Sequence, residues 1–417
     1  MSDWARKTSS VLMAVLVSAG VWAQEPVPAQ PRSPKWNVTL QGGPAYVPKT
    51  KAFSWRDEMM STYVYPAGSV EVGYQTTEED SPYAALYGFP NVGIGLGWDG
   101  LSSLHYNGPS RLDDIFNLYG FAERTLLQGK RVSLDFIFDL GAGFNRSLYD
   151  PETNPLNRNF NSYLVIFVSG GLSMHVALTD RLEAGVAAQL NHYSTGRLAY
   201  PNGGLNNPVA YLSLRYRNMK RPAGRGVVKP FQEAPERFFY EVYAGGGVHR
   251  CAREWIAFGT TEPWAQYSLG VSANWRYRPH LSTGVAVDLF DAPTRFLNRL
   301  EECERKLYGD ETIDTYGPYV PLSGGIGLIQ HLHYGRFSAF ATVGAYVYRH
   351  NGYRDQRGKL YQKVGLKYVL PGRSGLFVAA DCKAHGFSRA AMMEVTVGVR
   401  LKSSLDKTAK NDEFCME

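Results

Sequence analysis

In the segment 132–145, apolar residues alternate with residues that are polar or small except for Ile137. Val132, Phe138 and Phe144 lie on one parity, while Asp135 and Asp139 lie on the other. Because successive side chains of a β-strand point to opposite faces, this pattern predicts a strand with one apolar and one polar face. The pattern recurs at 92–98, 265–277, 337–347 and 391–401. We therefore predict an all-β, antiparallel protein.

Alternation also occurs in soluble β-sandwiches, so a soluble all-β protein is the alternative to a membrane barrel. Three features favour the barrel. The alternating segments are about ten residues or longer, as a tilted membrane strand requires. Their second face is rich in Gly, Ser, Asp and Asn, which suits a lumen. Aromatic residues gather near the expected strand ends, as in an interfacial girdle, namely Trp36, Trp98, Tyr193, Tyr200, Trp275, Tyr346 and Tyr348.

The first residues predict export. Arg6 and Lys7 precede a short apolar run that ends at Ala23. This is the layout of a signal peptide over 1–23, and the run is too short to serve comfortably as a membrane anchor. A Pro-rich linker follows over 24–35. The expected location after cleavage is the outer membrane of a Gram-negative bacterium.

Connections between the expected strands alternate between short and long. The long loops are 99–113, 146–161, 193–207 and 291–315. Outer-membrane barrels have short periplasmic turns and long external loops, so this alternation fits that class.

We expect about eight strands in each half of the chain. The halves are 36–218 and 238–402, with a basic linker at 219–237 and a polar tail at 403–417. The pattern leaves open whether they form one large barrel or two small ones.

Other classes of function receive no support from composition or motifs. The net charge of +6 is not concentrated in a basic run, so no nucleic-acid partner is expected. Neither Cys-x-x-Cys nor His-x-x-x-His occurs, so the sequence predicts no metal site and no cofactor. Cys251 and Cys303 fall in loops on the expected outer side. An oxidising compartment permits a disulfide between them, and two free thiols are the alternative.

The candidate for chemistry is the triplet His192-Tyr193-Ser194. His192 and Ser194 share the parity of Val186 and Leu190, so both should face lipid at the outer end of a strand. An imidazole beside a hydroxyl can take its proton, which is the nucleophile-and-base arrangement of acyl transfer. The alternative is a polar pair at the headgroup boundary without catalytic activity.

The surrounding segments resemble a known family. His192-Tyr193-Ser194-Thr195-Gly196 is followed by Pro201-Asn202-Gly203-Gly204-Leu205-Asn206 and then by an expected strand at 209–216. This arrangement resembles the PagL-type lipid A 3-O-deacylase (acyloxyacyl hydrolase) family over residues 36–218. The second half is similar to the extension of large, Bacteroidetes-like members, with marks at 361–368, 383–385 and 394–401.

The resemblance implies an eight-stranded outer-membrane barrel and assigns roles to residues. Ser194 corresponds to the nucleophile and His192 to the general base. Asn206 stands where the family has a carboxylate, and Thr195 stands where it usually has Asn. A backbone N–H of Thr195 or Gly196 is then expected to serve the oxyanion.

Further roles follow from the same resemblance. The Pro-Asn-x-Gly loop with Asn202 and Gly204 corresponds to a substrate loop. As alternatives to Asn206, Asp150 or Glu152 of another loop are candidates for the missing acid. Strand parity, and not the resemblance, sets His385 and Glu394 of the second half opposite the apolar residues of their strands, so both are expected to face the lumen in a structural network. A functional role for this inward set is the alternative.

The function implied is a cofactor-free and metal-free esterase that removes an acyl chain from lipid A, the membrane anchor of lipopolysaccharide in the outer leaflet. The alternative is a catalytically degenerate barrel that acts as a porin or as a surface structural or binding protein.

Overall fold

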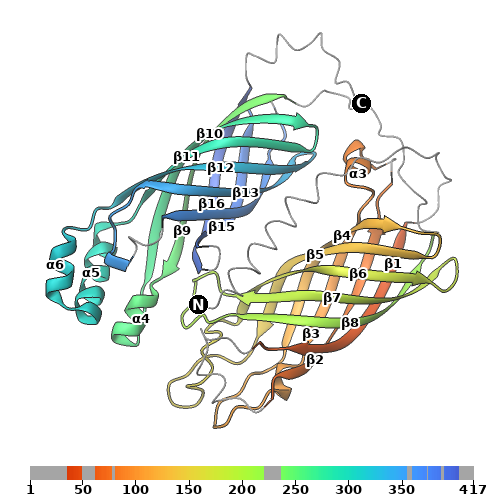
Figure 1. Ribbon diagram of the computed structural model, residues 1–417, viewed down its shortest axis with the longest axis horizontal. Helices are drawn as coiled ribbons and strands as arrows, with labels where there is room; N and C mark the ends of the chain where they lie inside the picture. Colours follow the sequence, from red (N-terminus) through yellow and green to blue (C-terminus); the bar gives the residue numbers. More distant parts are fainter. Residues whose placement is uncertain are drawn as a thin grey trace. The chain divides into compact units, whose positions relative to one another are not determined.

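The computed structural model describes residues 35–48, 62–77, 80–219, 236–354, 359–372, 374–386 and 389–402. The expected signal peptide, the tail at 403–417, and nearly all of both expected linkers lie outside these residues. The described chain forms two compact units, each built around a closed eight-stranded antiparallel barrel (Figure 1). The all-β barrel prediction is confirmed, and of the two arrangements left open the structure has two small barrels.

The first barrel contains the strands of the first half in chain order, and β1 closes the sheet against β8. Its strands are β1 (Trp36–Tyr46), β2 (Val64–Gln75), β3 (Asn91–Asp99), β4 (Ile115–Gln128), β5 (Val132–Asn145), β6 (Leu164–Ala177), β7 (Leu182–Ser194) and β8 (Leu205–Arg217). Every neighbouring pair is antiparallel, because each strand is joined to the next by a single turn or loop.

The second barrel repeats this order, and β16 closes it against β9. Its strands are β9 (Phe238–Arg250), β10 (Pro263–Arg278), β11 (Leu281–Asp291), β12 (Leu322–Tyr334), β13 (Phe337–Tyr348), β14 (Leu360–Val369), β15 (Leu376–His385) and β16 (Arg389–Lys402).

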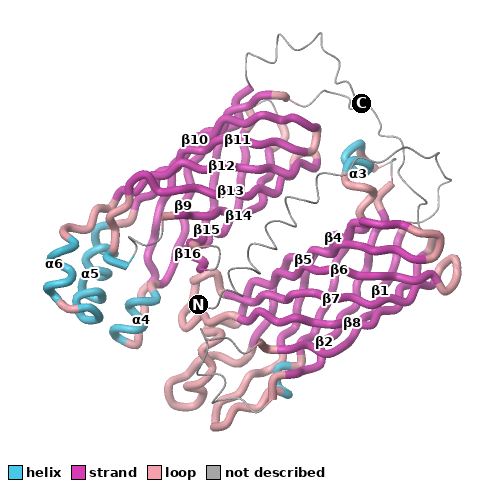
Figure 2. The backbone as a smooth tube through the Cα atoms, in the orientation of Figure 1, coloured by secondary structure: helices cyan, strands magenta, loops and turns pink. Residues whose placement is uncertain are grey.

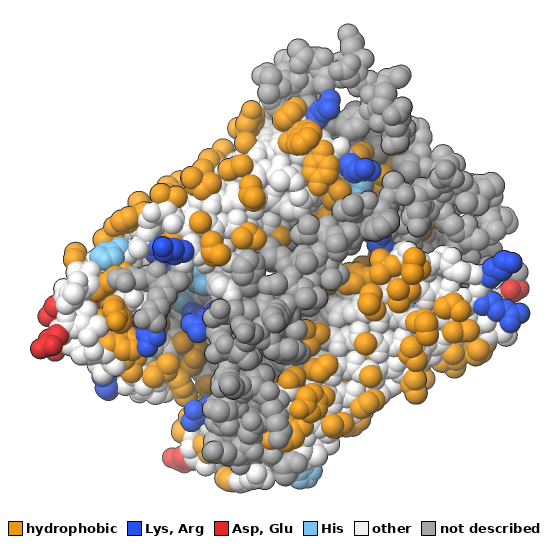
Figure 3. All heavy atoms as spheres, viewed as in Figure 1, with side chains coloured by type: hydrophobic (Ala, Val, Ile, Leu, Met, Phe, Trp, Pro, Cys, Tyr) orange, Lys and Arg blue, Asp and Glu red, His pale blue; other side chains and the backbone are white. Residues whose placement is uncertain are grey.

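Alternation along the strands separates the lumen from the outer wall. In β5, Ser133, Asp135 and Asp139 are buried inside the barrel, while Val132 and Phe144 are exposed on its outside. Apolar side chains cover the visible walls of both barrels, as Figure 3 shows, and some are largely exposed, such as Leu96 at 64% and Leu212 at 71%. A soluble protein does not expose apolar patches of this extent. The walls are therefore those of membrane barrels.

The aromatic girdle is only partly as expected. Trp36, Trp98 and Trp275 are exposed at strand ends. Tyr193, in contrast, is completely buried and points into the lumen, and Tyr346 packs against Tyr361 inside the second barrel. Both belong to the inward parity of their strands, and this parity outweighs the preference of tyrosine for the interface.

The long connections of the first barrel gather at one end (Figure 2). They include 100–114, which contains η2 (Leu101–Ser103), together with 146–163 and 195–204. Their apolar residues Leu104, Leu112 and Phe160 pack into one cluster with lumen residues and close this mouth. The opposite end has the short turns 129–131 and 178–181 and one longer connection that contains α3 (Pro82–Leu86).

The long connections of the second barrel are helical, contrary to the irregular loop expected at 291–315. They contain α4 (Ala252–Phe258), α5 (Thr294–Tyr308) and α6 (Asp310–Tyr316), which lie at one end of the barrel in Figure 1. Helix α5 buries residues with helical spacing, namely Phe296, Leu297, Leu300 and Cys303. None of the helices among the described residues is long and apolar enough to cross a membrane.

Cys251 and Cys303 are free thiols, so the expected disulfide is not formed. Cys251 is buried in the apolar cluster that contains Trp264 and Leu300, and Cys303 is buried on α5. A buried thiol of this kind packs as a small apolar group. Burial raises the pKa of the Cys251 thiol and that of the Cys303 thiol, the latter to about 12. Since the thiolate is the reactive form in disulfide exchange, both groups are chemically quiet here.

Both lumens are filled by polar side chains that bond to one another. In the first barrel Arg215 contacts Glu123 at 2.9 Å, and in the second Lys367 contacts Glu241 at 2.6 Å. The cavities found between these side chains measure about 10 Å³ and about 20 Å³. Each is large enough for about one water molecule, so neither of these cavities is a continuous aqueous path.

We therefore predict that the protein does not conduct ions as a porin does. The measurement is planar-bilayer recording of the purified full chain, with a general porin as the positive control. We expect no steady single-channel steps at low voltage, because ion-paired side chains fill the lumens. Reproducible ohmic steps from folded protein would show that the lumens open.

Candidate functional site

His192 lies near the outer end of β7, and Asn206 lies directly across from it on β8. His192 Nδ1 donates a hydrogen bond to Asn206 Oδ1 at 2.7 Å. An amide oxygen can only accept, so this bond places the imidazole proton on Nδ1 and leaves a lone pair on Nε2. This is the tautomer that a general base needs.

Ser194 is the last residue of β7 and lies on the same face of the strand as His192. Both side chains are partly exposed on the outer wall, whereas Asn191 and Tyr193 of the opposite parity are buried. The strand rise places the two Cα atoms roughly 6–7 Å apart, so the side chains are neighbours. Asn206 is exposed on the same wall.

Buried side chains of the opposite parity anchor both strand ends. The Tyr193 hydroxyl donates to Asp99, and Asn117 Nδ2 donates to the Tyr193 hydroxyl at 2.8 Å. On β8, Asn207 Nδ2 donates to the Tyr65 hydroxyl at 2.7 Å. Because Tyr193 lies between His192 and Ser194, and Asn207 follows Asn206, these bonds fix the backbone that carries all three outward groups.

The wall around the pair is apolar. Exposed Leu164, Val186 and Leu212 lie on β6, β7 and β8. An acyl chain that lies along this wall stays in an apolar environment, while the polar groups sit at the end that carries the long loops.

The loop after β7 modifies the expected oxyanion arrangement. The Thr195 N–H donates to Asn202 Oδ1 at 3.0 Å, so this donor already has an acceptor within the loop. Two backbone N–H groups, those of Thr195 and Gly196, were the expected donors to the oxyanion. The Thr195 N–H is already engaged by Asn202. Gly196 follows with a φ of +59°, which begins a left-handed turn.

Asn202 and Gly204 shape the loop. Gly204 has a φ of +60°, and a Cβ atom there would lie 2.7 Å from the backbone oxygen of Tyr193. Only glycine fits this position without strain. The structure thus shows a conformational role for both residues of the expected substrate loop.

The alternative acids do not orient the imidazole. Asp150 accepts hydrogen bonds from the backbone N–H groups of Thr153 and Glu152 and from the Thr153 hydroxyl. The bonds from Thr153 are the main cause that lowers the pKa of Asp150 below its usual range. Asp150 therefore closes its own turn, with Glu152 exposed in the same turn, and the group that holds His192 is Asn206.

The inward histidine of the second barrel has a different environment. His385 lies at the end of β15 and is hydrogen-bonded to the Tyr346 hydroxyl at 2.8 Å. Glu394 is buried, accepts a hydrogen bond from Ser268, and lies 3.4 Å from the Lys363 ammonium. Both residues belong to networks inside the barrel, as their parity predicts.

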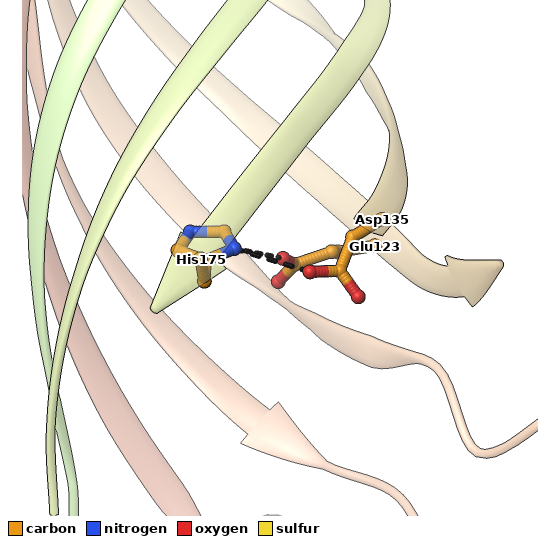
Figure 4. A group of neighbouring side chains, drawn as sticks. All are labelled: Glu123, Asp135 and His175. Carbon is orange, nitrogen blue, oxygen red and sulfur yellow. Dashed lines mark hydrogen bonds and ion pairs between the residues drawn. The ribbon is translucent and has the colours of Figure 1, made fainter. Parts of the chain in front are cut away.

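The sequence reading missed a group of possible metal ligands, Glu123, Asp135 and His175, inside the first barrel (Figure 4). His175 Nδ1 lies 3.1 Å from Asp135 and 3.7 Å from Glu123. The three residues come from β4, β5 and β6, so no short motif contains them. The sequence does show that all three residues share the inward parity of their strands and lie near short turns. Only the strand register shows that they are neighbours.

The closed barrels with apolar walls define a membrane β-barrel protein of the outer-membrane type. Residues 238–403 match the family model described as acyloxyacyl hydrolase, C-terminal domain. This match confirms the family resemblance for the second barrel; it does not extend over 36–218, the half that carries His192 and Ser194.

Solved structures resemble the chain only weakly. The Neisserial surface protein A is 10% identical with a TM-score of 0.29, over 44% of this chain and 96% of its own. The outer membrane enzyme PagL is 11% identical with a TM-score of 0.27, over 42% of this chain and 97% of its own. A mutant Rh. blastica porin is 9% identical with a TM-score of 0.16, over 88% of this chain and 99% of its own. No curated protein matches the sequence.

Proposed function

We propose that the protein is an outer-membrane esterase that removes an acyl chain from lipid A, with Ser194 as the nucleophile and His192 as the general base. The observation that carries the proposal is the hydrogen bond from His192 Nδ1 to Asn206 on the apolar outer wall. It leaves Nε2 as a proton acceptor on the face that Ser194 shares. The family of the second barrel, which is named for a hydrolase, also supports it.

The reaction proceeds in two halves. Ser194 Oγ attacks the ester carbonyl while His192 Nε2 takes the hydroxyl proton, and the C–O bond to the sugar breaks as the imidazolium returns this proton to the leaving oxygen. Water, deprotonated by the same nitrogen, then attacks the acyl-serine. The acyl C–O bond to Ser194 breaks as the imidazolium returns the proton to Ser194 Oγ, and the fatty acid is released. Asn206 holds the imidazole throughout, and we assign the oxyanion contact to the Gly196 N–H.

The position of the pair supports a lipid substrate. Groups on the outer wall meet molecules dissolved in the bilayer, and the end with the long loops is the external one in outer-membrane barrels. The ester therefore belongs to a lipid of the outer leaflet. Together with the export signal predicted at 1–23, this supports a location in the outer membrane of a Gram-negative bacterium.

The test is mass spectrometry of lipid A from cells that produce the full chain in their outer membrane. We expect a species lighter by one acyl or hydroxyacyl group, absent from cells with an empty vector. Phospholipids from the same extract report whether a glycerol ester is cut instead. A folded, membrane-inserted chain that leaves several lipid A types unchanged contradicts the proposal.

Asn206→Asp is expected to raise the deacylation rate about tenfold. A carboxylate accepts the Nδ1–H bond as the amide does, but it also stabilises the imidazolium formed during attack, and charge-assisted hydrogen bonds are roughly twice as strong as neutral ones. The measurement is the initial rate of acyl release in detergent micelles.

Asn206→Leu is the matched control, since it occupies similar space without an acceptor. We expect it to slow the reaction because the imidazole loses its partner. Equal rates for the Asp, Asn and Leu forms would show that residue 206 does not orient His192.

A further inference from the structure

The lumen of the first barrel holds more acidic than basic groups. Among the described residues of its strands, six carboxyl groups and two guanidinium groups are buried, namely Glu71, Asp99, Glu123, Asp135, Asp139, Glu183, Arg215 and Arg217. A buried carboxylate is costly unless it is neutralised, paired or bound to a metal ion. The lumen therefore favours an additional cation.

Glu123, Asp135 and His175 offer a place for one. One ligand atom from each lies within 4.8 Å of the other two, and all three residues are buried. Figure 4 shows the imidazole directed at both carboxyl groups from a neighbouring strand. The three belong to the adjacent strands β4, β5 and β6, near the short-turn end of the barrel.

A second observation points into the same place. A cavity of about 10 Å³ is lined by Glu123, His175 and Ser173, among others. The Ser173 hydroxyl is buried and has no hydrogen-bond partner in the structure. Ser173 lies opposite Asp135 in the sheet register and two residues before His175, so its hydroxyl faces the ligand group.

The neighbouring strand makes room for the imidazole. A Cβ atom at Gly185 of β7 would lie 2.5 Å from Cδ2 of His175. Any side chain at this position would displace the ring, so the glycine fixes where the imidazole lies. Around the carboxylates, Thr125 and Ser133 donate to Asp135, and Arg215 donates to Glu123. Carboxylates that bind metals are commonly held by such outer hydrogen bonds.

We propose that Glu123, Asp135 and His175 bind a divalent transition-metal cation, of the Zn²⁺ or Mn²⁺ type, inside the first barrel. One imidazole and two carboxylates are a set that these ions accept, and the cavity beside Ser173 holds the water that completes the coordination. The ion neutralises buried carboxylates and ties three adjacent strands together. This role is structural and does not depend on the esterase reaction at the outer wall.

The test is calorimetric titration of the full chain, folded in detergent and stripped with a chelator, with Zn²⁺ and separately with Mn²⁺. We expect one ion per chain. His175→Ala and Asp135→Asn should each weaken binding by more than ~100-fold. A loss of this size exceeds the usual effect of removing a residue that only hydrogen-bonds to a metal ligand. His105→Ala, which removes an exposed loop histidine, is the matched control and should bind as the parent does.

The folding of each variant is checked by heat-modifiable migration on gels, and only folded variants are titrated. Gly185→Ala is the second variant, because it displaces the ring without removing a ligand; we expect weaker binding. The visible absorption of bound Co²⁺ should show direct coordination in the parent chain and not in Asp135→Asn. A parent chain that takes up neither Zn²⁺ nor Mn²⁺ stoichiometrically, or a folded His175→Ala chain that binds equally well, overturns the proposal.

Discussion

Cells that produce the Ser194→Ala chain are expected to keep their lipid A fully acylated. Removing the hydroxyl removes the proposed nucleophile, and in serine hydrolases this costs about 10⁴-fold or more in rate. Because the side chain lies at the end of β7 on the outer wall and is only partly buried, the barrel should fold normally. The measurement is the lipid A mass profile together with acyl release in micelles.

Three further variants make this result specific. His192→Ala should lose as much activity as Ser194→Ala, and the double variant should lose no more, since nucleophile and base act as a unit. Ser169→Ala is the matched control, because this serine lies on the adjacent strand β6 and faces the lumen. It should retain activity. Activity that survives in folded Ser194→Ala places the reaction elsewhere.

How much of this arrangement the sequence predicts depends on how local the evidence is. The outward direction of His192 and Ser194, and the inward direction of His385, follow from strand parity alone, because alternation is set by the backbone of each strand. The expected outer face of β5 is confirmed for the same reason. Parity also distinguishes the two histidines, because His192 of the first barrel points outward and His385 of the second points inward. The family match nevertheless falls on the second barrel.

Features that depend on the path of a loop were not predictable. The sequence does not show that Asn202 accepts the Thr195 N–H or that Asp150 closes its own turn. The helices at 294–316 were missed because a long connection between strands was read as irregular. The ligand group around His175 required the register of three strands, which no single segment contains.

Replacing Glu241 with glutamine is expected to destabilise the second barrel by about 3–5 kcal/mol, the usual cost of breaking a buried ion pair from one side. Glu241 is fully buried and lies 2.6 Å from the Lys367 ammonium and 3.0 Å from Arg400. Glutamine keeps the size of the side chain but leaves the buried Lys367 and the partly buried Arg400 without their common counter-ion. The measurement is the urea midpoint of the folded chain, followed by the intrinsic fluorescence and by gel migration.

Glu236→Gln is the matched control, since Glu236 pairs at 3.2 Å with Lys402, which is 77% exposed. Exposed pairs contribute about 0–1 kcal/mol, so its midpoint should hardly move. Adding Lys367→Met to Glu241→Gln should recover part of the loss, because one unpaired cation is then removed. If Glu241→Gln unfolds no earlier than the control, water must already solvate these charges. The lumen would then be open to solvent, and the argument that it carries no current would fail with it.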